Sequence, residues 1–505
     1  MILQKKKPAD YFYLENVPGG YPLDVTHINL GCVIGPKLRK DLNFEGGSGI
    51  IIFQNGNYDL FFEKEPWFNA GRKIMEYMLE NDKRLEEWEF RVKAWIDYLS
   101  SVNKEFSQMN FSSLSDEELF VKLEFIKDLM KKETIENAEL VTNNYGTNFI
   151  QKEMEKAILE LGFATHSVSP IILRATVDFP LLKYEDEIAK LALFIIEKKI
   201  FKIDKDILEK EIKDKIDKIL EEYGWLDASI NGNPKSVESI TTDLNDLLSF
   251  KSEVYNIIQK RTQDKKEKSM ERDELLKEIL KDSNQMQKRQ IMFCIKSAEY
   301  GRMCVDEVMQ FLFNTRPIYN ELGKRLEIDE VELKFMHMDE IRDCLLNKKE
   351  VPKKDIMERQ KLCLCLVGEN KVEIYSGKEA QKWKDELASI VHDKDAPLKG
   401  EIAFSKGKVK GIARLVKDVK DMSKVNKGEI LVSSRTYPDL LPAMKKASAI
   451  VAELGGLLSH AAIVSRELGI PCLVGVRNAT SKIKDGDIIE IDTEKGVITI
   501  LNNGK

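Results

Sequence analysis

The segment 455–471, with the sequence GGLLSHAAIVSRELGIP, constrains the fold more than any other part of the chain. Two glycines, which permit tight turns and close approach to a ligand, lie shortly before His460. The residues Ala461 to Leu468 favour a helix, and Gly469 followed by Pro471 is typical of a helix end. The pattern therefore predicts a glycine-rich loop that places His460 at a helix N-terminus. Free N–H groups and the helix dipole favour an anion there.

Short predicted strands surround this helix. They cover Val409–Val416, Ile430–Ser433, Ala449–Val451, Cys472–Val474, Ile488–Ile491 and Val497–Ile500. A histidine that becomes phosphorylated is well placed at such a site, because the new negative charge is stabilised where it forms. The alternative interpretation is a histidine that only caps a helix in a β/α domain.

From about Gly400 to Leu501, the ordered pattern resembles the phosphohistidine swivelling domain of phosphoenolpyruvate synthase, pyruvate phosphate dikinase and rifampin phosphotransferase. The segments that carry the resemblance are 428–432, 436–439, 449–456 and 486–492, together with His460. The resemblance implies that His460 is phosphorylated. The residues expected to support the phosphate are Gly455, Gly456, Ser459, Ala461 and Arg435.

Leu458 departs from the pattern of the synthase and the dikinase, which usually carry a threonine two residues before the histidine. Regulation through that hydroxyl group is therefore not expected. A leucine at this position is more similar to rifampin phosphotransferase and related small-molecule kinases.

The composition of the chain excludes several classes of function. The 505 residues are 43% hydrophobic and 32% charged, with a net charge of −6, which gives no reason to expect nucleic acid or an acidic membrane as a partner. Seven scattered cysteines lack the spacing of metal ligands, so no metal site is expected. The sequence contains neither a secretion signal nor a long apolar stretch, which indicates a cytoplasmic protein.

The predicted fold class is multidomain α+β, with a large, mostly helical domain followed by a small β/β/α swivelling domain. Residues 1–63 form a β-rich N-terminal segment, and residues 64–391 form a mainly helical domain with a hairpin near 361–375. The resemblance implies that this helical domain is acceptor-binding-like. Residues 392–399 are polar, contain Pro and Gly, and are interpreted as an interdomain hinge. The swivelling domain covers 400–505.

The resemblance also implies that the phosphorylation of His460 needs a nucleotide-binding part that this sequence does not show. Relatives that use ATP carry an ATP-grasp domain, and the synthase and dikinase carry a phosphoenolpyruvate-binding barrel; the sequence shows neither. The glycine cluster 46–49 is interpreted as a plain loop. No cofactor is expected to bind directly, and ATP and Mg²⁺ are expected at a separate ATP-grasp subunit. The order of the domains is similar to that of rifampin phosphotransferase and of the larger subunit of phenylphosphate synthase.

Four residues are candidates for the acceptor side of the site. Relatives place an Arg and a Lys one turn apart before a long helix, and the matching region here contains Lys296, Glu299 and Arg302. His337 lies in a faintly similar segment and is a possible base for an acceptor hydroxyl. The alternatives are a surface ion ladder, in which Asp306 pairs with Arg302, and a structural role for His337.

Two functions are compatible with these observations. In the first, the chain is a phosphotransferase component, in which phosphorylated His460 passes its phosphoryl group to a small-molecule acceptor on the helical domain. In the second, it is a non-catalytic phosphocarrier or a protein-binding module with a relic swivelling domain. The sequence identifies neither the acceptor nor the phosphoryl donor, and it does not give the oligomeric state.

Overall fold

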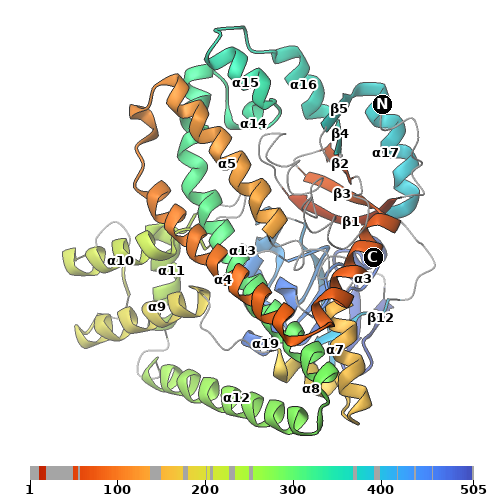
Figure 1. The fold of residues 1–505 in the computed structure, drawn as a ribbon. Coiled ribbons are helices and arrows are strands. Elements are labelled where there is room, and N and C mark those ends of the chain that lie inside the picture. The colour runs from red at the N-terminus through yellow and green to blue at the C-terminus, as the bar shows by residue number, and fades with distance from the viewer. Residues whose placement is uncertain are drawn as a thin grey trace.

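A computed structural model shows a large helical body with a mixed β-sheet domain at its C-terminal end (Figure 1), which confirms the predicted fold class. It describes residues 11–18, 49–54, 57–136, 149–173, 180–200, 202–204, 209–226, 234–249, 254–367, 372–391, 398–417, 419–436, 440–457 and 459–502. Of the predicted hinge 392–399, residues 392–397 lie outside this part of the chain.

Helix α13 (Gln285–Leu326) is the axis of the helical body. It has 42 residues, so it is roughly 63 Å long. Asn284 begins it with a capping box, in which its side chain and that of Gln287 each accept from the other's backbone N–H. The helix ends at Glu327, which has a left-handed conformation. Its buried face is apolar at helical spacing and packs against α4 (Asp82–Ser107) and α7 (Phe149–Glu160).

The helical body contains further helices. These are α3 (Lys64–Leu79), η3 (Phe111–Ser113), α5 (Asp116–Glu136), α8 (Thr165–Ile172), α12 (Val254–Asp282), α14 (Glu330–Leu333), α15 (Met338–Leu345) and α16 (Lys353–Lys361). Three others have a hydrophobic core of their own at one side of the body (Figure 1): α9 (Pro180–Glu197), α10 (Lys210–Tyr223) and α11 (Val237–Leu248).

A first sheet joins the beginning of the chain to a segment more than 300 residues later. Its strands are β1 (Tyr11–Pro18), β3 (Asn57–Glu63), β2 (Gly49–Gln54), β4 (Cys363–Val367) and β5 (Val372–Ser376), in that order and all antiparallel. The hairpin predicted near 361–375 is present as β4–β5, and β2 and β3 form a second hairpin in the β-rich N-terminal segment. Because β2 pairs with β4, the N-terminal segment and the hairpin near 361–375 contribute strands to one sheet. Helix α17 (Gly377–Val391) shares a hydrophobic core with it.

The C-terminal domain is built on a sheet with the strand order β12-β11-β7-β8-β9-β10-β6. The strands are β6 (Glu401–Phe404), β7 (Lys408–Leu415), β8 (Ile430–Ser433), β9 (Ala449–Ala452), β10 (Cys472–Val474), β11 (Ile488–Asp492) and β12 (Val497–Asn502). The helices of this domain are η5 (Val419–Lys424), α18 (Leu441–Lys446), α19 (His460–Leu468) and α20 (Ala479–Lys482). Strands β7, β8, β9 and β10 run parallel. Every residue of β8, β9 and β10 is buried, as is usual for parallel strands covered on both faces.

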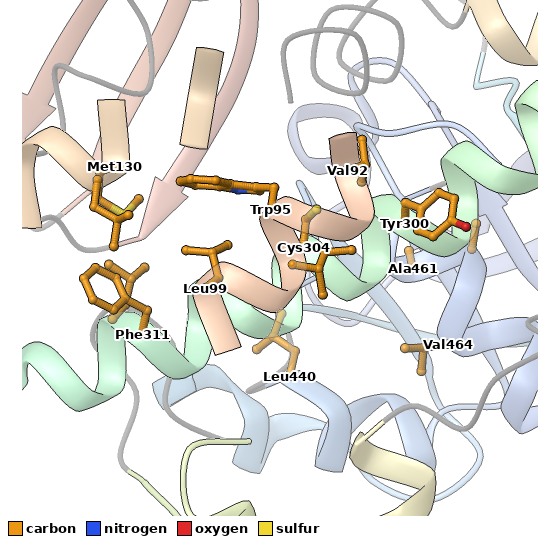
Figure 2. Close-up of a cluster of buried hydrophobic side chains, with 14 of the residues drawn as sticks. Val92, Trp95, Leu99, Met130, Tyr300, Cys304, Phe311, Leu440, Ala461 and Val464 are labelled. Atoms are coloured by element: carbon orange, nitrogen blue, oxygen red, sulfur yellow. The ribbon is translucent and has the colours of Figure 1, made fainter. Parts of the chain in front are cut away.

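The two faces of this sheet pack into different cores. Val432 and Val451 point into a core made entirely of residues from the C-terminal domain. Their neighbours Leu431 and Ile450 point to the other face, which belongs to the large core of the helical body. Figure 2 shows part of that shared core, where Leu440, Ala461 and Val464 of the C-terminal domain lie with Val92, Tyr300 and Cys304 of the body. The C-terminal domain is therefore docked on the helical body through apolar contacts.

Among the described residues, no helix is both long enough and apolar enough to span a membrane.

We expect Ile430→Ala to destabilise the C-terminal domain strongly. Ile430 is fully buried in the domain's own core, and truncating such a side chain costs about 2–5 kcal/mol. The matched control is Ile412→Ala, because Ile412 is 40% exposed in the neighbouring strand β7. Denaturant unfolding followed by hydrogen exchange of β8 measures both effects. Equal losses of unfolding free energy in the two variants would contradict the assigned core.

Candidate functional site

The predicted loop and helix around His460 are present in the structure. Helix α19 begins at His460 and ends at Leu468, followed by the C-cap Gly469, which has a left-handed conformation with φ 65°. Ser459 caps its first turn, since the Ser459 Oγ accepts a hydrogen bond of 3.4 Å from the backbone N–H of Ala462. The first N–H groups of the helix, those of His460 and Ala461, have no acceptor within the helix itself. They lie at the positive end of its dipole.

Gly455 shapes the loop that leads to this helix. Its φ of 99° is a conformation that residues with a side chain rarely adopt. A Cβ atom at this position would lie 2.6 Å from the Cβ of Ser459 and 2.9 Å from its Oγ. The carbonyl of Gly456 accepts a hydrogen bond of 3.0 Å from the backbone N–H of Ser459. Glycine at 455 thus lets the loop fold back against the helix cap. Leu458 lies outside the described residues.

Thr436 holds the imidazole ring of His460. The Thr436 Oγ1 lies 2.9 Å from the His460 Nδ1, and Thr436 is almost completely buried in the loop that follows β8. With Nδ1 engaged by this hydroxyl group, Nε2 is the nitrogen that is left to attack an electrophile. The imidazole is half-buried, so it keeps access to solvent. Thr436 belongs to the segment 436–439 that carries the resemblance, which gives it no role; its position three residues after the buried strand β8 is the signal that the sequence offers.

The surroundings of His460 favour the neutral imidazole. Burial lowers the pKa of His460 well below its usual value of 6.5, and the positive charges of Arg302 and Arg435 lower it further. A neutral imidazole carries the lone pair that a nucleophile needs. The same two guanidinium groups would attract a negatively charged phosphoryl group. All five residues predicted to support a phosphate lie in the loops and helix that frame His460, and their role in phosphate binding stays a prediction.

Arg302 comes from the middle of α13 and brings a charge of the helical body to His460. It forms a bidentate ion pair with Asp306, with distances of 3.0 Å from Nε to Oδ2 and 2.8 Å from Nη2 to Oδ1. Both side chains are buried, so this pair is not part of a surface ladder. Burial raises the pKa of Asp306, although the charge of Arg302 acts in the opposite direction.

The other acceptor-side candidates make different contacts. Lys296 forms an ion pair with Glu89 of α4, which also accepts a 2.6 Å hydrogen bond from the hydroxyl of Tyr300. Glu299 pairs with Arg272 of α12 at 3.7 Å. Lys296 and Arg302 are six residues apart, about 240° around a helix, which explains why they face different neighbours. Of these three residues, Arg302 is the one whose charge acts on His460.

His337 lies in a different part of the molecule. It precedes α15, and its backbone N–H donates a 2.9 Å hydrogen bond to the Glu340 Oε2 in a capping box. Helix α15 lies near the C-terminal end of α13, away from α19 (Figure 1). Between Arg302 and that end, α13 advances by roughly 36 Å. The structure therefore gives His337 a helix-capping position and does not bring it to His460.

No group of three or more His, Cys, Asp or Glu side chains within the described ranges is arranged to hold a metal ion.

Comparison with known proteins agrees with this site. Residues 425–496 match the family model "PEP-utilising enzyme, mobile domain", so the segment that contains His460 carries this domain. The chain is 44% identical over 121 residues to the "Probable phosphoenolpyruvate synthase" of Archaeoglobus fulgidus, which covers 24% of this chain and 16% of that protein. It is 46% identical over 113 residues to the "Phosphoenolpyruvate synthase" of Pyrococcus furiosus, which covers 22% of this chain and 14% of that protein.

A longer match covers more residues than the C-terminal domain 400–505 contains. The "Uncharacterized phosphotransferase YvkC" of Bacillus subtilis is 32% identical over 180 residues, which is 34% of this chain and 21% of that protein. The chain thus spans between 14% and 21% of the length of these three relatives. The domain is related to phosphotransferases, and the predicted resemblance is confirmed for it.

We expect His460 to titrate below pH 6.5 in the folded protein. Its lowered pKa means that the unfolded chain binds a proton more readily in this range. Stability contributed by neutral His460 is therefore present above pH 6.5 and is lost as the pH falls toward the lowered pKa. NMR titration of the imidazole signals measures the midpoint, and His460→Gln identifies the signal by its loss. A midpoint at or above 6.5 would contradict the described surroundings.

Replacing the buried pair should move this midpoint. In the double variant Arg302→Met with Asp306→Leu, the volume is largely kept and no buried charge is left alone. Although the pair is removed as a whole, Arg302 is the member whose charge lowers the His460 pKa, so we expect this pKa to rise, and to stay below 6.5 because burial remains. Lys296→Met is the matched control and should leave the midpoint unchanged. Identical NMR midpoints in wild type and double variant would show that Arg302 does not act on His460.

Proposed function

We propose that the chain is a phosphotransferase component in which His460 carries a phosphoryl group to a small-molecule acceptor bound by the helical body. One observation supports this most strongly: a neutral, half-buried histidine at a helix N-terminus lies beside Arg302, a cation supplied by the other part of the molecule. A histidine that only capped a helix would need neither the neutral state nor that cation.

The chemistry follows from the two ring nitrogens. Attack through Nε2 requires the proton of neutral His460 on Nδ1, where the Thr436 hydroxyl, 2.9 Å away, can accept its hydrogen bond; the Nε2 lone pair then attacks the phosphorus of a donor. The P–N bond forms while the bond to the donor's leaving group breaks, and the leaving group keeps that electron pair. In the second step, an acceptor hydroxyl oxygen attacks the phosphorus. The P–N bond breaks, its electron pair returns to Nε2, and the hydroxyl proton passes to solvent.

The surrounding groups stabilise charge in both steps. Phosphoryl transfer has a loose transition state, so positioning and electrostatics supply most of the catalysis. The N–H groups of His460 and Ala461, the Ser459 hydroxyl and Arg435 would hold the phosphoryl oxygens from the side of the C-terminal domain. Arg302 would do so from the side of the helical body, where the acceptor is proposed to bind. This arrangement supports the body as the acceptor side.

The donor side of the reaction is also a proposal. The relatives named phosphoenolpyruvate synthase suggest that the phosphoryl group originates from a nucleotide or from an enol phosphate. We propose ATP with Mg²⁺, bound by a separate ATP-grasp subunit that phosphorylates His460. To reach the ATP-grasp subunit and the acceptor on the helical body in turn, the C-terminal domain would leave the body by rotating about residues 392–399.

We expect His460→Ala to abolish phosphorylation without unfolding the chain, since its side chain is half-buried rather than part of the core. The protein is mixed with a candidate ATP-grasp partner and ATP labelled at the β-phosphate, and acid-labile label on the chain is counted. His337→Ala is the matched control and should retain full labelling. Acid-labile label that persists in His460→Ala would overturn the assignment, and label that never leaves wild-type protein would favour a carrier without an acceptor.

A further inference from the structure

We propose that Gln151 is a positioning residue that fixes the C-terminal domain on the helical body in the orientation that brings His460 to Arg302. Gln151 lies on α7 and is 2% exposed. Its side-chain carbonyl accepts a 2.9 Å hydrogen bond from the backbone N–H of Leu457, three residues before His460. Its amide group donates a 2.8 Å hydrogen bond to the Oε2 of Glu401, on strand β6. One side chain of the body thus holds two separate elements of the C-terminal domain.

Every donor and acceptor atom of the Gln151 side chain has a hydrogen-bond partner, and these partners allow only one orientation of the amide group. Its amide also donates to the Oε1 of Glu155 at 2.9 Å, so both amide hydrogens and the carbonyl are used. A carboxylate only accepts and a backbone N–H only donates, so the amide cannot be turned around. Burial, together with the charge of Glu401, raises the pKa of Glu155. Two carboxylates therefore converge on a single amide in a buried place, which makes the arrangement intolerant of other side chains.

The apolar contacts around α19 cannot set this orientation alone, because hydrophobic contact has no preferred direction. The network of Gln151 does, since any other docking would take the acceptor away from the buried Leu457 N–H and the Gln151 amide donor away from Glu401. Leaving the body costs little by comparison, because water replaces the two hydrogen bonds that Gln151 makes to the C-terminal domain. Such a contact specifies one docked geometry and still allows release.

Other polar contacts between the two parts are weaker candidates. The Lys445 Nζ lies 2.5 Å from the Glu185 Oε1, but the Lys445 side chain is 40% exposed, and exposed ion pairs contribute little. The Lys268 Nζ donates a 3.2 Å hydrogen bond to the carbonyl of Glu467, which lies near the far end of α19. Neither contact touches the loop that carries His460.

The test compares hydrogen exchange in three variants of the full chain. Gln151→Leu removes all three hydrogen bonds and keeps the approximate size of the side chain. Gln151→Glu still accepts from Leu457 but places a third carboxylate beside Glu155 and Glu401. In the triple variant Gln151→Glu, Glu155→Gln, Glu401→Gln, two amides donate to one carboxylate, so every lost hydrogen bond is restored with its direction reversed.

We expect Gln151→Leu and Gln151→Glu to raise exchange about tenfold or more in the loop 455–459 and in the facing parts of α7 and α13. Strands β8, β9 and β11 should stay protected, because the C-terminal domain keeps its own core. The triple variant should return to wild-type exchange. Lys445→Gln is the matched control at the same interface and should have no effect.

Three results would overturn the inference: unchanged exchange in both single variants, equal loss of protection in β8, β9 and β11, or no recovery in the triple variant. The second result would show that Gln151 supports folding rather than docking. The consequence for His460 rests on the proposed function, but the measurement uses unphosphorylated protein without a donor. Failure here would therefore leave the proposed phosphoryl transfer standing, and failure of the labelling experiment would leave the docking role of Gln151 standing.

Discussion

The position of α19 between the C-terminal sheet and α13 is the constraint on which the rest of the site depends. Packing of this helix half-buries His460, and burial is the largest cause of its lowered pKa. The same packing brings Arg302 close enough to act on the ring. Without docking, His460 would keep Thr436 and Arg435 from its own domain but would lose the cation of the body. The electrostatic character of the site is therefore a property of the docked arrangement.

One face of the C-terminal sheet stabilises the fold of its own domain, and the other face docks that domain on the helical body. Along β8 and β9, alternate residues point into two different cores, one internal to the domain and one shared with the body. The internal core stabilises the fold of the domain even when its other face is uncovered, as a moving domain requires. The shared core supplies affinity, and the buried hydrogen bonds of Gln151 supply direction. The alternating apolar residues of β8 and β9 thus stabilise the domain on one face of the sheet and bind the helical body on the other.

Much of this could be predicted from the sequence, and the limits have physical causes. Helix α19, its Ser459 cap and its Gly469 end follow from local preferences, so they could be predicted residue by residue. The pairing of β2 with β4 could not, because both strands are apolar and nothing local selects a partner 300 residues away. Spacing predicted the Arg302–Asp306 pair, whereas its burial beside His460 depends on docking. Gln151 carried no signal, since its partners meet it only in the folded molecule.

The uninterrupted length of α13 has a consequence for how such a chain can vary. Each residue of a helix turns it by about 100°, so a single insertion between Arg302 and Leu326 would rotate one half of the body relative to the other. An insertion of seven residues falls only about 20° short of two full turns and would preserve the facing surfaces. Changes in the length of α13 are therefore compatible with the site only in such steps, while the loops around it are free to grow by any number of residues.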